Sequence, residues 1–423
     1  MLGGSAFFRS GRWRSETVRG RVAAVAGAVL LSLVAILFAR LADLAQQLFV
    51  TGWRAQPLLM PLLTPMMFVA VVHVTRRWFP AARGSGIPQV MAAADQPALA
   101  ASGPLVSLRT AAAKLAGTLA MLLAGGSVGR EGPTVQVSAA VLAAMHRWLR
   151  VPISRGVLIA GGAAGVAAAF NTPLAGVAFA IEELATAFEQ RVAVYVMAVV
   201  MIAGLVSLGL TGDYVYFGLV AQSIDVPTML LVAPLAGVAG GAAGGLFARV
   251  LVTMVWSRQP WVAAVRAHPL RLALGGGVVV ALCGVLSDGQ SWGTGYDTTR
   301  ALLSGQNADL LFGPAKFLAT LATALSGAPG GIFAPSLSVG AGLGQVLAQL
   351  FPGSSSGAIV LLGMAGYFTA VVRAPLTSVI IMMEMTADRS MILPLFATAI
   401  IADWVGARVC RPKLYKTLSR QFR

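Results

Sequence analysis

Long apolar runs, separated by short polar or glycine-rich turns, make up most of this 423-residue sequence. The first run covers residues 22–39, which are 18 residues without a charge. It is longer than the roughly 7–15 apolar residues of a signal peptide and more runs follow, so we predict an uncleaved first transmembrane helix. Further apolar segments are expected near residues 58–74, 104–124, 133–145, 156–181, 193–210, 227–255, 269–286, 310–325, 332–350, 358–371, 375–386 and 391–407.

Several of these segments are too short to cross a bilayer, and glycine and proline interrupt many of them. The chain contains 48 Gly and 21 Pro. Within a bilayer, a broken helix survives only where protein or a water-filled cavity satisfies the freed backbone groups. The pattern therefore predicts an all-α polytopic membrane protein, with broken and re-entrant helices along an ion or substrate path.

Composition and charge support a membrane protein over a nucleic-acid-binding one. Only 11% of the residues are charged and 57% are hydrophobic, which excludes a cytosolic enzyme. The net charge is +16, but the basic residues lie at the chain ends and in loops, so no nucleic-acid partner is expected. Two distant cysteines and three scattered histidines share no ligand spacing, so neither a metal nor another cofactor is expected.

The basic ends also predict the topology and the domain organisation. Residues 1–21 and 408–423 are rich in Lys and Arg, so the positive-inside rule places both termini in the cytoplasm, with an even number of crossings. We expect a transmembrane domain over residues 22–407, with repeat halves of about 22–210 and 227–407. The protein is then a multi-pass protein of the inner (plasma) membrane.

An internal repeat with a constant offset of 202 residues relates the two halves. Residues 146–156 carry three arginines, whereas their counterpart at 348–358 has none, so equivalent loops lie on opposite membrane faces. An inverted repeat places a site at the midplane, where half-helix N-termini attract an anion. The matched pairs include Lys114 and Lys316, Gly129 and Gly331, Pro133 and Pro335, Gly161 and Gly363, and Glu182 and Glu384.

Three glycine-rich turns are candidates for those N-termini: residues 84–88 (GSGIP), 129–133 (GREGP) and 327–335 (GAPGGIFAP). Glycine allows backbone amides to turn toward a ligand, and proline suits the first turn of a helix. Each turn alone is also compatible with a simple connection between helices. Their combination predicts an anion site.

Together with AAAFNTPLAGVAFAIEE at 167–183, RAPLTSVIIMMEMT at 373–386 and a late tyrosine, these motifs resemble the CLC family of chloride channels and proton-coupled chloride antiporters, and its short prokaryotic members in particular. The resemblance implies a homodimer in a lipid bilayer, with chloride and protons as substrates and bound chloride ions. It also implies a transporter rather than an enzyme. A polytopic intramembrane enzyme would need a nucleophile and base or a metal set, and the spans contain no such cluster.

The resemblance assigns chloride binding to several residues. Ser85, beside the flexible backbone of Gly86, supplies a hydroxyl donor, although the residues alone also allow a helix N-cap serine. Tyr415 becomes the second hydroxyl donor, whereas its basic surroundings alone favour an aromatic anchor at the membrane interface. The amides of Ile332 and Phe333 complete the implied site.

Two acids carry the implied proton path. Glu131 is a carboxylate in an apolar setting, which is by default functional. As an anion it can occupy the place of chloride, so it is the expected gate and external proton site. Arg130 and Gly132 contribute backbone to an outer anion position. Glu183 matches the inner proton-transfer glutamate of antiporters, which favours exchange over the alternative, a passive voltage- or pH-gated chloride channel.

The remaining polar residues of the repeat are expected to be structural. Glu182 and Glu384 are repeat partners and should make buried hydrogen bonds, and Pro133 and Pro335 start helices. Lys114 and Lys316 should either tether backbone carbonyls or snorkel. Asp43 is expected in a loop or a helix cap.

Departures from other branches refine the expected substrate. Ser85 replaces the proline of nitrate-preferring members, and the intact GREGP and Tyr415 argue against the fluoride-exporting branch. Chloride is the leading anion, with similar monovalent anions also carried. Because the chain ends soon after Tyr415, no C-terminal regulatory nucleotide-binding domain is expected.

Overall fold

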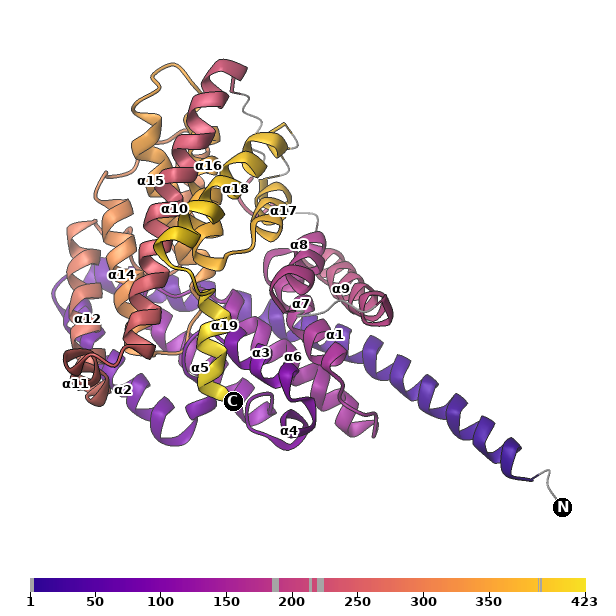
Figure 1. The fold of residues 1–423 in the computed structure, drawn as a ribbon. Coiled ribbons are helices and arrows are strands. Elements are labelled where there is room, and N and C mark those ends of the chain that lie inside the picture. The colour runs from indigo at the N-terminus through magenta and orange to yellow at the C-terminus, as the bar shows by residue number, and fades with distance from the viewer. Residues whose placement is uncertain (1–3, 185–189, 213–214, 219–223, 387, 389) are drawn as a thin grey trace.

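The computed structural model describes residues 4–184, 190–212, 215–218, 224–386, 388 and 390–423, and within them it contains nineteen α-helices and no β-strand (Figure 1). The predicted all-α fold is therefore confirmed. The helices of the first half are α1 (Gly4–Ala55), α2 (Leu59–Trp78), α3 (Ile87–Asp95), α4 (Pro97–Ser102), α5 (Leu108–Leu123), α6 (Glu131–Trp148), α7 (Arg155–Phe170), α8 (Pro173–Phe179) and α9 (Gln190–Thr211).

In the described part of the chain the second half contains ten helices, of which the last is a short C-terminal helix. Short 3₁₀ turns cover Pro80–Ala82 and Arg420–Phe422, and a π-helical turn covers Ala180–Leu184. The helices are α10 (Val226–Trp256), α11 (Pro260–Ala267), α12 (Pro269–Leu286), α13 (Tyr296–Leu303), α14 (Phe312–Ser326), α15 (Phe333–Ala348), α16 (Ser356–Val372), α17 (Pro375–Thr386), α18 (Ile392–Val409) and α19 (Leu414–Ser419).

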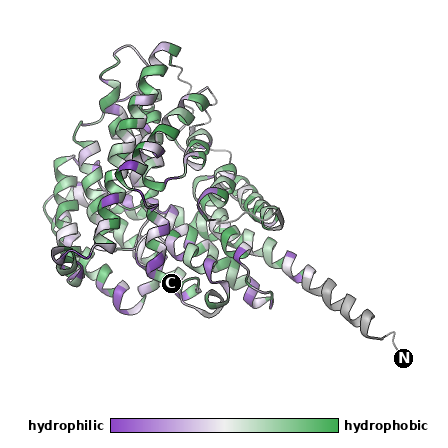
Figure 2. Cartoon of the chain, viewed as in Figure 1, coloured by the Kyte–Doolittle hydropathy of each residue, from purple (hydrophilic) through white to green (hydrophobic). Residues whose placement is uncertain are grey.

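Six helices in the described part of the chain are long and apolar enough to cross a membrane, namely Thr17–Ala55 within α1, α2, Val192–Thr211 within α9, α10, α12 and α18. Several other apolar helices, including α7, α15, α16 and α17, have only 10–17 residues. Hydrophobic residues recur along most of the helices (Figure 2). Short apolar helices inside a bundle of longer ones are the expected broken-helix architecture of a membrane transporter.

Two predicted boundaries are wrong. The first helix is not confined to residues 22–39, because α1 continues through Arg40 and Asp43 to Ala55 with no proline to end it. The apolar segment at 156–181 is not one helix, because Asn171 adopts the left-handed conformation (φ 57°) and Pro173 starts the next helix. Asparagine tolerates this conformation better than most residues, and a proline follows naturally after such a helix end.

The two halves meet at a twofold-like junction. The backbone N–H of Gly129 donates to Gly331 O at 2.7 Å, and the N–H of Gly331 donates to Gly129 O at 2.8 Å. These residues are related by the 202-residue offset, so each is the repeat equivalent of the other. The reciprocal pair places the pseudo-symmetry axis between α6 and α15.

A second reciprocal contact joins α8 to α17. The Glu384 carboxylate accepts hydrogen bonds from the N–H groups of Leu174 and Ala175, at 3.1 and 2.7 Å. The Glu182 carboxylate accepts from the equivalent N–H groups of α17, at 3.1 and 2.7 Å. The matching partners confirm the predicted inverted repeat.

The C-terminal helix α19 returns from the second half to the first, where it packs on α3 (Figure 1). Tyr415 on this helix is completely buried. The end of the chain therefore closes the junction between the repeat halves and contributes side chains to it.

Candidate functional site

The three predicted glycine-rich turns lie together at the junction of the halves. The N–H of Gly330 donates to Gly84 O at 3.1 Å, which links the third turn to the first. The second turn contacts the first through Gly132, where an added Cβ atom would collide with Ser85 Oγ. Together with the reciprocal pair of glycines described above, these contacts gather the starts of α3, α6 and α15 in one place.

Glycine and proline in these turns have direct geometric reasons. Gly86, the N-cap of α3, has a φ of 112°, and a Cβ atom there would lie 2.6 Å from Gly132 O. Pro133 and Pro335 are the third residues of α6 and α15 and are buried. In the first helical turn the N–H that proline lacks has no intrahelical partner to lose.

Ser85 and Tyr415 present buried hydroxyl groups to one cavity of about 420 Å³. Neither hydroxyl has a hydrogen-bond partner among the described residues. Ser85 is not a helix cap, because the N-cap of α3 is Gly86 and the helix has no side-chain cap. Tyr415 is not an exposed interface anchor, because its exposure is 0%. Two unpartnered hydroxyl donors facing a cavity are suited to a ligand that accepts hydrogen bonds.

The start of α15 borders the same cavity. Ile332 is the N-cap of α15 and lines the cavity, and Phe333 is the first helical residue. The Phe333 ring packs beside the ring of Tyr415, with 6.0 Å between centroids. As the N-cap and the first helical residue, both stand where backbone N–H groups have no intrahelical acceptor. Free amides at a helix N-terminus attract an anion.

Three arginines, Arg76, Arg83 and Arg266, line the same cavity. Arg83 lies over the ring of Phe422, 4.9 Å from its centroid, which holds the guanidinium beside the C-terminal turn. Basic side chains around a cavity raise the local concentration of anions. The charge of the cavity therefore matches the hydroxyl and amide donors within it.

Glu131 is fully buried and is the first residue of α6. Its Oε1 accepts a hydrogen bond of 2.7 Å from the Tyr296 hydroxyl, and its Oε2 accepts one of 3.4 Å from the Ala334 N–H in the first turn of α15. The carboxylate thus lies at the N-terminal ends of α6 and α15. This is a place that the helix dipoles make favourable for an anion.

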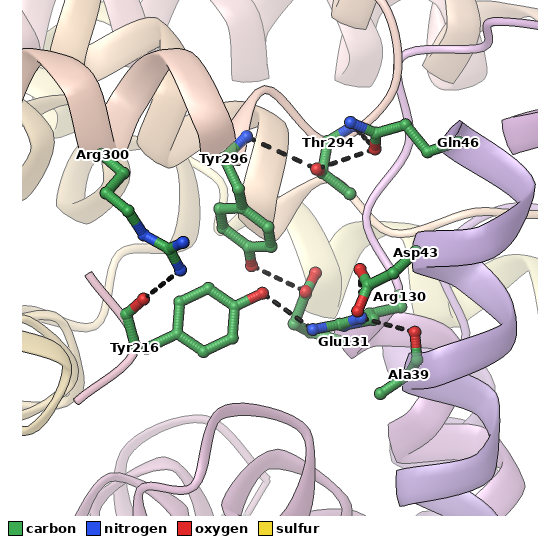
Figure 3. Close-up of polar contacts among 9 residues, drawn as sticks. All are labelled: Ala39, Asp43, Gln46, Arg130, Glu131, Tyr216, Thr294, Tyr296 and Arg300. Carbon is green, nitrogen blue, oxygen red and sulfur yellow. Dashed lines mark hydrogen bonds and ion pairs between the residues drawn. The ribbon is translucent and has the colours of Figure 1, made fainter. Parts of the chain in front are cut away.

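Arg130 points away from the cavity, toward α1. Its guanidinium donates to Asp43 Oδ1 and to Ala39 O, both at 2.7 Å, and to the Tyr216 hydroxyl at 2.8 Å (Figure 3). The Arg130 side chain is therefore used to fix the turn. Its backbone and that of Gly132 remain beside Glu131 at the start of α6.

The sequence missed three residues of this network: Asp43, Tyr216 and Tyr296 (Figure 3). The prediction that Asp43 lies in a loop or cap is wrong, because it lies within α1 and forms an ion pair with Arg130. Tyr296 begins α13, a short polar helix without an apolar run. The sequence did offer one signal, the glycine-rich stretch GTG at residues 293–295, directly before this helix. In the structure both of its glycines have positive φ.

Glu183 lies in the π-helical turn after α8, with its side chain 1% exposed. Neither carboxylate oxygen accepts a hydrogen bond from a described residue. Its ion-pair partner is Lys413, whose Nζ lies 3.7 Å from Oε2 and whose side chain is 40% exposed. The segment that carries Tyr415 to the cavity therefore also brings a partly exposed cation to Glu183.

Glu182 and Glu384 have a different environment from Glu183. Both carboxylates are half-buried and accept backbone hydrogen bonds from the first turns of α17 and α8, as described above. The Thr377 hydroxyl also donates to Glu182 Oε2 at 2.8 Å. These contacts make each acid a cap for the helix of the opposite repeat.

The two repeat lysines tether backbone carbonyls. Lys114 Nζ donates to Gly84 O at 2.7 Å and to Arg83 O at 3.3 Å. Lys316 Nζ donates to Gly293 O at 2.7 Å and to Ser291 O at 3.0 Å. Lys114 thereby holds the turn that carries Ser85, and Lys316 holds the turn before Tyr296.

A broken-helix membrane bundle with an inverted repeat and a buried acid at converging helix N-termini defines an ion-transport protein. The profile of the family described as voltage gated chloride channel matches residues 67–407. The chain belongs to this family, the CLC family.

Its curated relatives include proteins named H(+)/Cl(-) exchange transporter ClcA. The chain is 34% identical to the one from Yersinia pestis bv. Antiqua (strain Angola) over 375 residues, which are 82% of this chain and 75% of the relative. It is 32% identical to the one from Cronobacter sakazakii (strain ATCC BAA-894) over 377 residues, which are 84% of this chain and 78% of the relative.

Solved structures share the fold. A slow cyanobacterial Cl⁻/H⁺ antiporter matches with a TM-score of 0.80 and 23% identity, covering 96% of this chain and 98% of that one. A CLC-type fluoride/proton antiporter matches with a TM-score of 0.77 and 24% identity, covering 95% of this chain and 97% of that one. Both comparisons extend over nearly the whole chain.

Proposed function

We propose that this protein exchanges chloride, and similar monovalent anions, for protons across the membrane. The observation that carries the proposal is the position of Glu131. A buried carboxylate accepts hydrogen bonds at the N-terminal ends of two half-helices, beside a cavity with free hydroxyl donors. A carboxylate in such a place stands where a transported anion is also stabilised.

In this proposal chloride binds between the two halves. The hydroxyls of Ser85 and Tyr415 donate to it, and the amides of Ile332 and Phe333 add the field of the α15 N-terminus. The backbone of Gly86 allows the close approach of the first two turns. A monovalent ion needs no paired arginines at the centre, because several neutral donors satisfy a single charge.

Glu131 couples chloride to protons by competing with chloride. As a carboxylate it fills the anion position, and the backbone of Arg130 and Gly132 lines the outer side. Protonation removes the charge that the helix N-termini stabilise, so the side chain leaves and chloride enters. Return of Glu131 to the site then requires loss of its proton. One side chain thus binds one substrate and excludes the other.

Glu183 receives the proton on the cytoplasmic side. It is buried but faces a partly exposed lysine, so protons reach it without crossing the chloride cavity. A passive channel on the same fold has no use for a second buried acid of this kind. Exchange is therefore the preferred function, and a passive channel is the alternative.

The proposal also includes the cellular setting. The protein lies in the inner membrane with both termini in the cytoplasm, as the basic ends of the chain favour. It forms a homodimer with one pathway in each subunit, which the family resemblance implies. Chemical crosslinking in membranes would give a dimer band if this part is correct, and a monomer alone would contradict it.

The test is proton movement by the purified protein in proteoliposomes under an imposed chloride gradient. Exchange predicts that chloride flow drives protons uphill in a sealed vesicle at zero membrane potential. The reverse experiment, a proton gradient that drives chloride uphill, should also succeed. Chloride flux without any proton movement would instead identify a channel.

A further inference from the structure

A buried tyrosine outside the predicted site makes a direct contact with the proposed gate. Tyr296 lies on α13 in the second half of the chain, 165 residues from Glu131, and only 7% of it is exposed. Its hydroxyl donates to Glu131 Oε1 at 2.7 Å (Figure 3). The hydrogen bond to the other oxygen, from the Ala334 N–H, is longer at 3.4 Å. Of these two donors to the carboxylate, Tyr296 thus makes the closer contact.

Aromatic packing fixes the ring of Tyr296. The rings of Tyr216 and Phe217 meet it in edge-to-face contacts, with centroids 4.8 and 5.6 Å away. Tyr216 is itself fixed, because its hydroxyl accepts from Arg130 and its carbonyl accepts from Arg300 at 2.7 Å. The phenol of Tyr296 is therefore held by its neighbours rather than by Glu131.

The backbone before Tyr296 is fixed as well. Lys316 holds the turn at Ser291 and Gly293, and the Thr294 N–H and hydroxyl both donate to Gln46 Oε1 at 3.0 Å. The Ser338 hydroxyl donates to Thr294 O at 3.1 Å. These bonds tie the start of α13 to α1, α14 and α15. If one partner of the Tyr296–Glu131 bond moves during transport, it is the glutamate.

We propose that Tyr296 is a positioning residue that holds the Glu131 carboxylate in the anion position and so weakens the competition of chloride for that position. This inference rests on the proposed function. A hydrogen bond from a hydroxyl to a charged acceptor is stronger than one to a neutral acceptor. When the carboxylate leaves, the buried phenol loses its partner, which is unfavourable. Tyr296 therefore favours the state in which Glu131 occupies the site.

The direct test is equilibrium chloride binding, measured by isothermal titration calorimetry on the purified full-length protein at fixed pH. The variant Tyr296→Phe keeps the ring but removes the hydroxyl. We expect it to bind chloride up to roughly tenfold more tightly than wild type, because its carboxylate competitor is less well held. A purely structural tyrosine predicts unchanged or weaker binding, and that result would overturn the proposal.

A matched control is Tyr367→Phe. Tyr367 is also fully buried among aromatic rings, and its hydroxyl has no partner among the described residues. Chloride affinity should not change in this variant. An equal gain in affinity would show that loss of any buried phenol loosens the protein, and it would contradict the inference.

A double-mutant cycle separates an effect through Glu131 from a direct effect on chloride. In the Glu131→Ala background, Tyr296→Phe should leave chloride affinity unchanged. A change as large as that in the wild-type background would overturn the proposal. Should Tyr296→Phe fail to fold, Tyr296→Leu provides a second variant without the hydroxyl, with the same expected direction. Failure of the proposed function is distinguishable, because it appears as absent exchange by the wild-type protein.

Discussion

The two buried acids of the proposed proton path have opposite environments. Glu131 accepts a hydrogen bond at each carboxylate oxygen and lies at two helix N-termini. Glu183 accepts none from the described residues and has a lysine at ion-pair distance. Glu131 is thus held as an anion is held in a binding site. Among the described residues, Glu183 has instead an electrostatic contact that extends toward the exposed surface.

This difference explains how two carboxylates divide one task. A group that competes with chloride needs a site shaped for an anion, with directed donors. A group that only passes protons needs burial and access, and directed donors would favour one protonation state. The neighbouring acid, Glu182, shows the contrast within one turn of the chain. Unlike Glu183, it accepts hydrogen bonds from backbone N–H groups and so caps a helix.

The largest expected effect follows replacement of the acid at the helix N-termini. Glu131→Ala should abolish coupled proton transport, because no side chain remains that both takes the anion position and binds a proton. Chloride flux should continue. Paired chloride and pH electrodes on proteoliposomes measure both quantities. Coupled proton movement in this variant would show that Glu131 is not the gate.

Replacement of the inner acid should affect only protons. Glu183→Gln should reduce proton transport at least roughly tenfold, while chloride flux stays within about threefold of wild type. The same paired recording applies, with Glu182→Gln as the neighbouring control that keeps proton coupling. If Glu182→Gln lost coupling and Glu183→Gln did not, our assignment of the two acids would be reversed.

The hydroxyl groups in the cavity should affect chloride more than protons. Ser85→Ala and Tyr415→Phe each remove one donor, so each should weaken equilibrium chloride binding by up to roughly tenfold. Calorimetric titration with chloride provides the measurement. Thr369→Val is a suitable control, because this threonine in α16 is also fully buried with no hydrogen-bond partner for its hydroxyl among the described residues. Equal loss of binding in the control would contradict a specific role.

Lys413 offers a smaller test of the inner acid. Its ammonium stabilises the charged form of Glu183, so in Lys413→Met the protonated form persists to higher pH. The pH dependence of proton transport should therefore move upward, by less than about one pH unit because the lysine is partly exposed. Lys416→Met, in α19, removes a lysine that acts on Glu183 in the same direction but more weakly, so its shift should be smaller. A shift to lower pH would contradict this electrostatic role.

The smallest expected effect concerns the caps of the repeat. Glu182→Gln and Glu384→Gln each weaken two backbone hydrogen bonds at a helix N-terminus, so each should lower the unfolding free energy by about 1 kcal/mol. Thermal unfolding in detergent should show a decrease for both variants, larger for Glu182→Gln because its carboxylate also accepts from the Thr377 hydroxyl, with exchange retained. No decrease in either one of the variants would contradict the symmetry of the backbone contacts.

Local sequence signals were enough to predict most of the fold. Apolar runs, glycine-rich turns and the 202-residue offset each depend on nearby residues or on simple comparison of the halves. They predicted the gathering of three turns, including Gly84, Gly129 and Gly331, which the structure confirms. The break at Asn171 was missed, although Asn followed by Thr-Pro is itself a typical signal for the end of a helix.

The partners of the two acids could not be predicted, because they come from distant and mostly polar segments. Tyr296 lies in a short polar helix 165 residues from Glu131, and Asp43 lies 87 residues from Arg130 in a helix expected to have ended already. Lys413 lies in a basic segment, and the local sequence does not show which of its basic residues pairs with Glu183. Only the packing of the two halves selects among such residues.

Equilibrium chloride binding to Glu131→Gln tests the central claim most directly, because glutamine has nearly the shape of glutamate without its charge. If the carboxylate occupies an anion position, the variant should bind chloride more tightly than wild type, by roughly tenfold or more, or should bind an additional ion. Unchanged affinity and stoichiometry in a folded variant would contradict competition between Glu131 and chloride, and with it the proposed coupling.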